Sequence, residues 1–322
     1  MTDDACWMGQ AIALGERARG RSAPNPNVGC VIVKDGEMVG EGWTQPGGRP
    51  HAEAVALAEA GARAHGATAY VTLEPCAHVS PRGPACADLL VEAGVGRVVA
   101  AIGDPDPRTN GQGFDRLRSA GIAVEVGTGA EEASRSMAGF LTRVRLGRPY
   151  VTLKLAMSID GKIALPSGES KWITGEDARA HVHLERARAD MILVGRGTYE
   201  ADSPKLDVRL PGLEERSPRR ALLTRGDPVE GWTRLGSPEA IHELGDVNDL
   251  LVEGGSATAT AFLTADLVDR MLVYRAPILI GDGKSSVGYV GLEGIADAHG
   301  RWQLTETRLL GIDRLEVYER LR

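Results

Sequence analysis

Two short stretches decide how the first half of this chain is interpreted: His51-Ala52-Glu53, and then Glu74-Pro75-Cys76 with a second thiol at Cys86. One imidazole and two thiols give zinc three protein ligands and leave its fourth position open for water. Zinc lowers the pKa of that water toward neutrality, so a hydroxide nucleophile is available at the pH of a cell. The pattern therefore predicts a hydrolytic zinc site with His51, Cys76 and Cys86 as ligands.

Glu53 stands two residues after His51 and can reach the same water without being a ligand. Its carboxylate can take the water proton and pass it to a leaving amine. The order H-x-E followed by P-C is the signature of zinc-dependent base deaminases, and the catalytic role of Glu53 is taken from that signature. Each motif is weak alone, whereas both in this order are specific. The alternative is a pair of buried cysteines and a histidine at a helix N-terminus.

Length and composition describe a globular protein with two domains. The chain has 322 residues, of which 43% are hydrophobic and 25% charged. The net charge is −7 and the chain has no broad basic stripe, so a long nucleic acid is not an expected partner. Four cysteines are too few for a disulfide scaffold. Neither a signal-peptide core nor an apolar run of about 20 residues is visible, so we expect a cytoplasmic protein without membrane contact.

The first half alternates predicted helices and strands. We expect helices over residues 4–19, 51–64, 86–92 and 114–119, and strands over 28–33, 38–43, 69–73, 97–102 and 122–126. This order places ligands at the N-termini of two helices packed on one sheet, where the positive helix ends favour thiolate over thiol. Residues 128–147, approximately, form a predicted helical connector to the second domain.

The second half is a predicted α/β domain. Strands are expected at 150–156, 191–194, 220–224, 249–252 and 270–280, a helix from about residue 176, and two final strands within 302–322 joined at Gly311. Val252 to Ala257 contains paired glycines between a strand and a helix, which let backbone amides approach a diphosphate. The stretch is not G-x-G-x-x-G, so a plain tight turn is the alternative to a nucleotide site.

With these motifs on both halves, the chain resembles the bifunctional deaminase–reductase family of riboflavin biosynthesis, the RibD type. The matching stretches are residues 23–29, 51–53, 72–78, 104–107, 154–161, 167–174, 201–209, 252–255 and 276–281, so the resemblance covers about residues 5 to 320. It implies an α/β fold: a cytidine-deaminase-like α/β/α sandwich over residues 1–147, and a dihydrofolate-reductase-like α/β domain over 148–322.

The resemblance also implies two consecutive reactions. The first is zinc-dependent removal of the 2-amino group from a 2,5-diamino-6-(ribosylamino)pyrimidinone 5′-phosphate. The second is NADPH-dependent reduction of the ribosyl side chain to ribityl. The implied cofactors are Zn²⁺ and NADPH, and the implied partner is this small-molecule substrate. A homo-oligomer, most simply a dimer, is expected from the general frequency of such assemblies.

Residue roles in the second domain follow from the same resemblance. Positions that contact NADPH in the family correspond here to Met157, Trp172, Thr198, Asp202, Thr224, Gly255 and Ser256. Positions that hold the substrate correspond to Ser170, Arg186, Leu206, Arg209 and Glu253. The forked donors of arginine suit a phosphate ester, although either arginine could be an ordinary surface residue. Lys154 is a candidate polar group near the hydride acceptor.

Two residues of the first domain have open assignments. Asn25 lies in the family's substrate loop, and is either a substrate contact or a turn residue between prolines. His78 either touches the substrate phosphate or caps a helix. The nine residues between Cys76 and Cys86 are one more than the common family pattern, which changes the loop but not the ligands.

Two rival interpretations remain. In one, the chain is only a reductase and its zinc domain is structural, which would gain support if Cys30 were a fourth ligand. In the other, a nucleoside or nucleic-acid deaminase is fused to an unrelated domain. Such enzymes usually carry P-C-x-x-C, whereas this chain has a much longer gap between its thiols.

Overall fold

The computed structural model describes residues 3–78 and 80–322, and the chain separates into two compact units, Met1–Gly147 and Arg148–Arg322. Each unit has its own sheet and its own hydrophobic clusters. Both units combine helices with a mixed sheet, which confirms the predicted α/β fold class.

Unit 1 contains a five-stranded sheet in the order β2-β1-β3-β4-β5. The strands are β1 (Gly29–Lys34), β2 (Glu37–Trp43), β3 (Thr68–Leu73), β4 (Arg97–Ile102) and β5 (Ala123–Val126). β1 is antiparallel to β2 and β3, while β3, β4 and β5 are parallel. β1 and β3 lie inside the sheet and are buried on both faces, which is why their sequences are continuous apolar runs.

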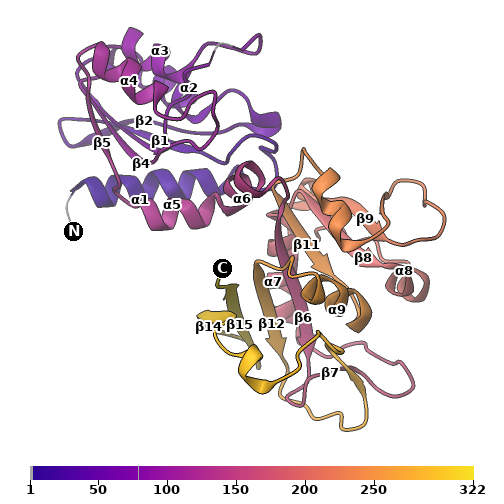
Figure 1. Cartoon of the computed structure of the whole chain (residues 1–322). Helices are drawn as coiled ribbons and strands as arrows, with labels where there is room; N and C mark the ends of the chain where they lie inside the picture. The colour runs from indigo at the N-terminus through magenta and orange to yellow at the C-terminus, as the bar shows by residue number, and fades with distance from the viewer. Residues whose placement is uncertain (1–2, 79) are drawn as a thin grey trace. The chain divides into compact units, whose positions relative to one another are not determined.

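Helices cover both faces of this sheet (Figure 1). One face carries α1 (Asp3–Glu16), α5 (Ala130–Ser136) and α6 (Ala138–Leu146), and the other carries α2 (Ala52–Ala60), α3 (Cys86–Glu92) and α4 (Gln112–Ser119). Glycines allow close approach, because a Cβ at Gly29 would collide with the carbonyl of Ala11, and one at Gly42 with that of Ala52. The backbones of α1 and α2 therefore rest directly on the sheet.

Two of the helices predicted in unit 1 are shorter than expected. The helix predicted over 4–19 ends at Glu16, where the chain enters a series of turns that includes Gly20 with a φ of 75°. The helix predicted over 51–64 ends at Ala60 and continues only as a 3-10 turn, Gly61–Ala64. Gly61 has a φ of 53°, which is incompatible with a continued α-helix. The predicted connector forms two short helices, α5 and α6.

Unit 2 contains an eight-stranded sheet in the order β10-β9-β8-β11-β6-β12-β15-β14. The strands are β6 (Tyr150–Met157), β8 (Met191–Gly195), β9 (Arg219–Leu223), β10 (Thr233–Leu235), β11 (Asp249–Glu253), β12 (Arg270–Arg275), β14 (Trp302–Leu310) and β15 (Asp313–Arg320). The six strands β10, β9, β8, β11, β6 and β12 are parallel to one another. β15 is antiparallel to β12, and β14 is antiparallel to β15. A separate two-stranded sheet joins β7 (Lys162–Ala164) to β13 (Lys284–Ser285).

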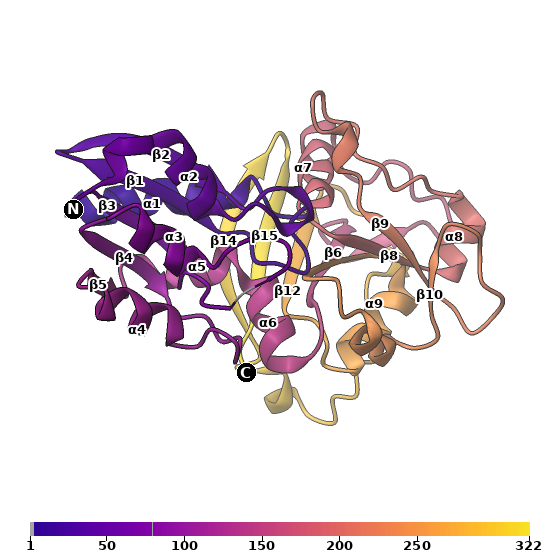
Figure 2. The same cartoon turned by 90° about the horizontal axis from the view of Figure 1, so that it is seen from above.

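The helices of unit 2 lie on opposite sides of its sheet, with α7 (Glu176–Ala187) on one side and α9 (Ser256–Thr264) on the other (Figure 2). Ala259 and Phe262 of α9 pack into one buried cluster, whereas Ala178 and Val182 of α7 pack into another. The short helix α8 (Arg196–Asp202) follows β8 directly. The strand predicted over 270–280 ends at Arg275, because Pro277 has no amide hydrogen for a sheet bond.

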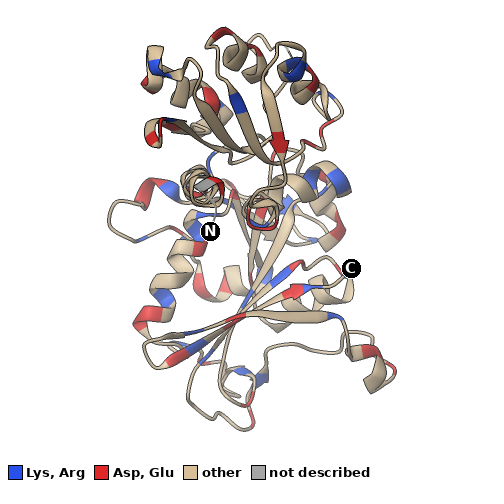
Figure 3. Ribbon diagram, turned by 90° about the vertical axis from the view of Figure 1, so that its left-hand side faces the viewer, with Lys and Arg blue, Asp and Glu red and all other residues tan. Residues whose placement is uncertain are grey.

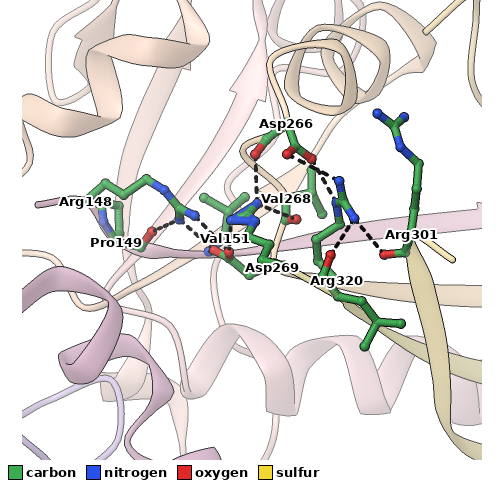
Figure 4. Close-up of polar contacts among 10 residues, drawn as sticks. Arg148, Pro149, Val151, Asp266, Val268, Asp269, Arg301 and Arg320 are labelled. Carbon is green, nitrogen blue, oxygen red and sulfur yellow. Dashed lines mark hydrogen bonds and ion pairs between the residues drawn. The ribbon is translucent and has the colours of Figure 1, made fainter. Parts of the chain in front are cut away.

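A network of ion pairs with a buried centre, Arg148 and Asp269, fixes the first residue of unit 2 (Figure 4). Arg148 donates two hydrogen bonds to Asp269, at 2.7 and 2.9 Å, and Asp269 also accepts the amide of Val151. The C-terminal Arg322 donates to the same carboxylate at 3.0 Å, and Arg320 pairs with Asp266. The start of β6 and the last residues of the chain are therefore attached to one acidic residue before β12.

Basic and acidic residues are both scattered over the ribbon of each unit (Figure 3). Among the described residues, no helix has the length and apolar character that crossing a membrane requires.

Candidate functional site

The three predicted zinc ligands converge in unit 1. His51 is the N-cap residue of α2, Cys86 is the first residue of α3, and Cys76 follows the end of β3. His51 Nδ1 lies 3.3 Å from the Sγ atom of Cys86 and 3.6 Å from that of Cys76, and the three ligand atoms all lie within 4.8 Å of one another. Tetrahedral zinc, with bonds of about 2.0–2.3 Å, holds its ligand atoms roughly 3.5 Å apart, so this donor set fits zinc.

The local backbone favours negative charge on Cys76. The amide of Cys86, at the N-terminus of α3, donates to Cys76 Sγ at 3.3 Å. The Cys86 thiol and this amide, together with His51, lower the pKa of Cys76 to about 4, although burial opposes them. These contacts favour the thiolate form of Cys76, which is the form that binds a metal.

Glu53 lies in the first turn of α2 and its side chain is buried, with 3% of the residue exposed. Burial raises the pKa of this carboxyl above its usual value, and the charge of Cys76 acts in the same direction. A carboxyl group with a raised pKa beside a metal site is suited to hold and release a proton near neutral pH. It is not one of the residues that form the metal-binding group.

Three further side chains of unit 1 bear on this site. Asn25 Nδ2 lies 3.2 Å from His51 Nε2, the ring nitrogen that does not face the thiols, and donates to the Gly48 carbonyl. Asn25 thus contacts a predicted ligand, a role that its sequence context did not suggest. His78 Nδ1 is buried and has no hydrogen-bond partner among the described residues. Cys30 is fully buried in β1, and within the described residues the metal-binding group contains only His51, Cys76 and Cys86.

The second candidate site lies in unit 2, at and beyond the carboxyl ends of parallel strands, which is where open α/β sheets bind ligands. β6 ends at Met157, β11 ends at Glu253, and Thr224 directly follows β9. Thr198, in the α8 helix that follows β8, lies beside the glycine turn: a Cβ at Gly255 would be 3.9 Å from its Oγ1. Ser256 is the first residue of α9 and completes this group.

A charged cluster connects α7 to the sheet. Arg186 donates to both carboxylate oxygens of Glu253, at 2.7 and 2.9 Å, and Lys154 Nζ lies 4.0 Å from the same carboxylate. Burial alone would raise the pKa of Glu253, but Arg186, Lys154 and His183 together outweigh it and the net shift is downward. Burial lowers the pKa of Lys154, and Glu253 opposes this effect. Arg186 and Glu253 therefore form a largely buried ion pair, with Lys154 as a second cation beside it.

His183 is a member of this cluster that the sequence motifs did not single out. Its Nε2 lies 3.3 Å from Arg209 Nη2, and its Nδ1 lies 3.1 Å from the Asp207 carbonyl oxygen, which also accepts from Arg186. His183 precedes Arg186 by three residues on α7, so both face the same way. This three-residue spacing on a predicted helix was the sequence signal that could have identified His183.

The remaining predicted residues of unit 2 differ in exposure: one group is exposed and the other is buried. Trp172 is 68% exposed, with the Arg179 guanidinium 4.8 Å from its ring, and Asp202 pairs with Lys171 at 2.6 Å. Ser170 is also exposed. By contrast, Met157, Leu206 and Thr224 are buried, so only their backbone or a small part of their side chain can reach a ligand. Leu206 has a φ of 56° and packs among core residues.

Comparison with known proteins assigns both halves. A family profile described as the RibD C-terminal domain matches residues 149–315, and one described as the cytidine and deoxycytidylate deaminase zinc-binding region matches residues 1–102. The riboflavin biosynthesis protein RibD of Escherichia coli is 43% identical, with 96% of this chain and 97% of that protein covered. The RibD of Mycobacterium tuberculosis is 42% identical over 96% of this chain and 95% of that protein.

Solved structures agree along the whole chain. Acinetobacter baumannii RibD superposes with a TM-score of 0.91 at 37% identity, and 99% of both chains is covered. A deaminase/reductase from Thermotoga maritima gives a TM-score of 0.89 at 31% identity, again with 99% coverage of both chains. This chain therefore belongs to the RibD family of bifunctional riboflavin-biosynthesis enzymes.

Proposed function

We propose that the chain deaminates 2,5-diamino-6-(5-phosphoribosylamino)pyrimidin-4(3H)-one in unit 1 and reduces the product, 5-amino-6-(5-phosphoribosylamino)uracil, in unit 2. The observation that carries this proposal is the convergence of His51, Cys76 and Cys86 beside the buried Glu53. The family relationship supports the same pair of reactions, since the Thermotoga maritima relative is described as both a deaminase and a reductase.

The residues of unit 1 have distinct parts in deamination. His51, Cys76 and Cys86 would hold zinc, which supplies Lewis acidity and lowers the pKa of water. Glu53 holds a proton on its carboxyl and delivers it to the departing amino group, which leaves as ammonia. Asn25 lies against the far ring nitrogen of His51, on the side of the ring away from the thiols. His78 lies two residues beyond Cys76, and we assign it to the substrate side of the site.

In unit 2 we assign the cofactor to the carboxyl ends of the parallel strands, with Met157, Trp172, Thr198, Asp202, Thr224, Gly255 and Ser256 around it. NADPH bound there supplies the hydride. Arg186, Arg209 and Glu253, with Ser170 and Leu206, hold the substrate, and Lys154 lies beside Glu253 near the reacting sugar. The paired charges keep these side chains in fixed positions, and an incoming phosphate can be bound by the forked guanidinium of Arg209.

The test is mass spectrometry of the diaminopyrimidine substrate after incubation with zinc-loaded protein. We expect a gain of about one mass unit without NADPH and about two more with it, because oxygen replaces an amine and then a hydride and a proton are added. No change without NADPH, together with reduction of the deaminated compound, would identify a reductase with a structural zinc domain. Turnover of cytidine instead would identify the other rival.

Two further expectations stay predictions. A dimer is tested by light scattering of the purified protein at several concentrations. Residence in the cytoplasm is tested by fractionating the cells that express the chain.

A further inference from the structure

Glu74 is a buried carboxylate beside the metal ligands that the proposed chemistry does not use. It precedes Cys76 by two residues, and 3% of it is exposed. Its Oε1 atom accepts the amides of Gly113 and Phe114, at 2.9 and 3.3 Å. Its Oε2 atom accepts the amides of Gly111 and Asp104, at 3.0 and 3.2 Å. A single side chain thus collects four backbone hydrogen bonds.

These bonds use the whole accepting capacity of the carboxylate. An ionised carboxylate has about four lone-pair sites, and here four amides are directed at them. Gly113 and Phe114 belong to the first turn of α4. All four contacts are with backbone amides, so Glu74 acts on the backbone that carries it.

The backbone that carries Glu74 continues directly to the predicted zinc ligand Cys76. The Glu74 amide donates to the Ile102 carbonyl at the end of β4, at 2.9 Å. A Cβ at Gly113 would collide with the Pro75 carbonyl oxygen, so the first turn of α4 rests against the peptide immediately before Cys76. α4 therefore holds the segment from one side.

The N-terminus of α3 holds Cys76 through a second set of contacts. The Ala87 amide donates to the Cys76 carbonyl at 3.2 Å, and the Cys86 amide donates to the Cys76 sulfur at 3.3 Å. Cys76 is consequently fixed between two helix N-termini, one acting on its own atoms and one acting through Glu74. Loss of either set of contacts would let its sulfur move relative to His51 and Cys86.

We propose that Glu74 is the positioning residue of the metal centre: it joins the end of β3 to α4 and thereby holds Cys76 in place before zinc binds. The inference rests on the proposed zinc site but adds a residue to it that contacts neither metal nor substrate. Outer partners of metal ligands typically change metal affinity by about 10- to 100-fold when they are replaced.

The experiment measures metal binding by the full-length chain, wild type against Glu74→Gln. The replacement preserves shape but turns two acceptor sites into donors that face backbone amides. We expect zinc affinity, measured against a competing chelator, to fall about 10- to 100-fold. We also expect the thiolate-to-metal absorption of the cobalt-substituted protein to change. Glu92→Gln, an exposed residue at the end of α3, is the matched control and should bind as wild type does.

A second measurement does not depend on how the variant folds. In the wild-type chain, amide exchange at Gly111, Gly113 and Phe114 should be equally slow with and without zinc, because the contact precedes the metal. Protection that arises only with zinc would overturn the inference, as would unchanged affinity and cobalt absorption in Glu74→Gln. Failure of the wild type to bind zinc would instead contradict the proposed function.

Discussion

The two candidate sites of this protein are built in opposite ways. In unit 1 the His51, Cys76 and Cys86 side chains converge on a common point as a set of metal-binding atoms. In unit 2 the charged side chains are already paired with one another, as Arg186 is with Glu253. The first arrangement presents ligand atoms to a metal ion, whereas in the second the Glu253 carboxylate already has cationic partners. Substitutions should therefore act on chemistry in unit 1 and on charge balance in unit 2.

The largest expected effect tests the first half of this contrast. Glu53→Gln should lower the deamination rate by about 10²- to 10⁴-fold, because the amide cannot carry the proton to the leaving amine. Zinc content and reduction of the deaminated substrate should be unchanged. Both rates and the bound metal are measured on the same preparation. A variant that still deaminates at roughly a tenth of the wild-type rate would mean that another group moves the proton.

A prediction of intermediate size tests the paired charges of unit 2. Arg186→Met should reduce the free energy of unfolding of unit 2 by about 3 kcal/mol, since removing one partner leaves Glu253 buried with insufficient compensation. Adding Glu253→Gln should recover part of this loss, although reductase activity stays low. Urea denaturation of the single and double variants gives the two free energies. Equal stability of both variants would show that the uncompensated charge of Glu253 does not cause the loss.

The smallest effect concerns a buried acid outside both sets of site residues. Burial, and then the charge of Asp249, raise the pKa of Asp190 to about 7. Because the folded pKa lies above the unfolded one, the protonated form stabilises the fold at low pH and this contribution is lost as the pH rises through that folded pKa. Asp190→Asn should therefore be more stable than the wild type at about pH 8, by on the order of 1–2 kcal/mol, but not at about pH 5.

This result is measured by urea unfolding at the two pH values. Asn can still accept the amides of Asn248 and Asp249, which both reach one oxygen of Asp190. If the variant and the wild type respond to pH in the same way, Asp190 does not titrate in this range.

How far the sequence predicted the fold depended on the local signal. The helix predicted over 86–92 and the strand predicted over 97–102 coincide with α3 and β4. The strands β10 (Thr233–Leu235) and β13 (Lys284–Ser285) were not predicted, since each is very short and has little apolar pattern. They form only because a partner strand supplies the hydrogen bonds, which no local pattern encodes.

The candidate sites also combine features that have a local sequence signal with features that have none. His51, Cys76 and Cys86 were predicted from residue type and spacing, because zinc chemistry requires particular atoms and short motifs supply them, and the structure brings their ligand atoms together. Glu53 was predicted from the same motif. The contacts of Glu74 with Gly111 and Gly113 could not be found in that way. They join residues 37 and 39 positions apart, and they exist only because β3 and β4 are adjacent in the sheet.

The sequence by itself determined the α/β class, the candidate metal-binding atoms and the chemistry that they could support, because these follow from residue types and from the periodicity of apolar residues. Only the tertiary structure decided which groups contact which: Asn25 the ring of His51, Glu74 the amides of Gly111 and Gly113, and His183 the guanidinium of Arg209. The physical reason is that hydrogen bonds and ion pairs act over a few ångströms. They depend on distances between elements that are remote in the chain.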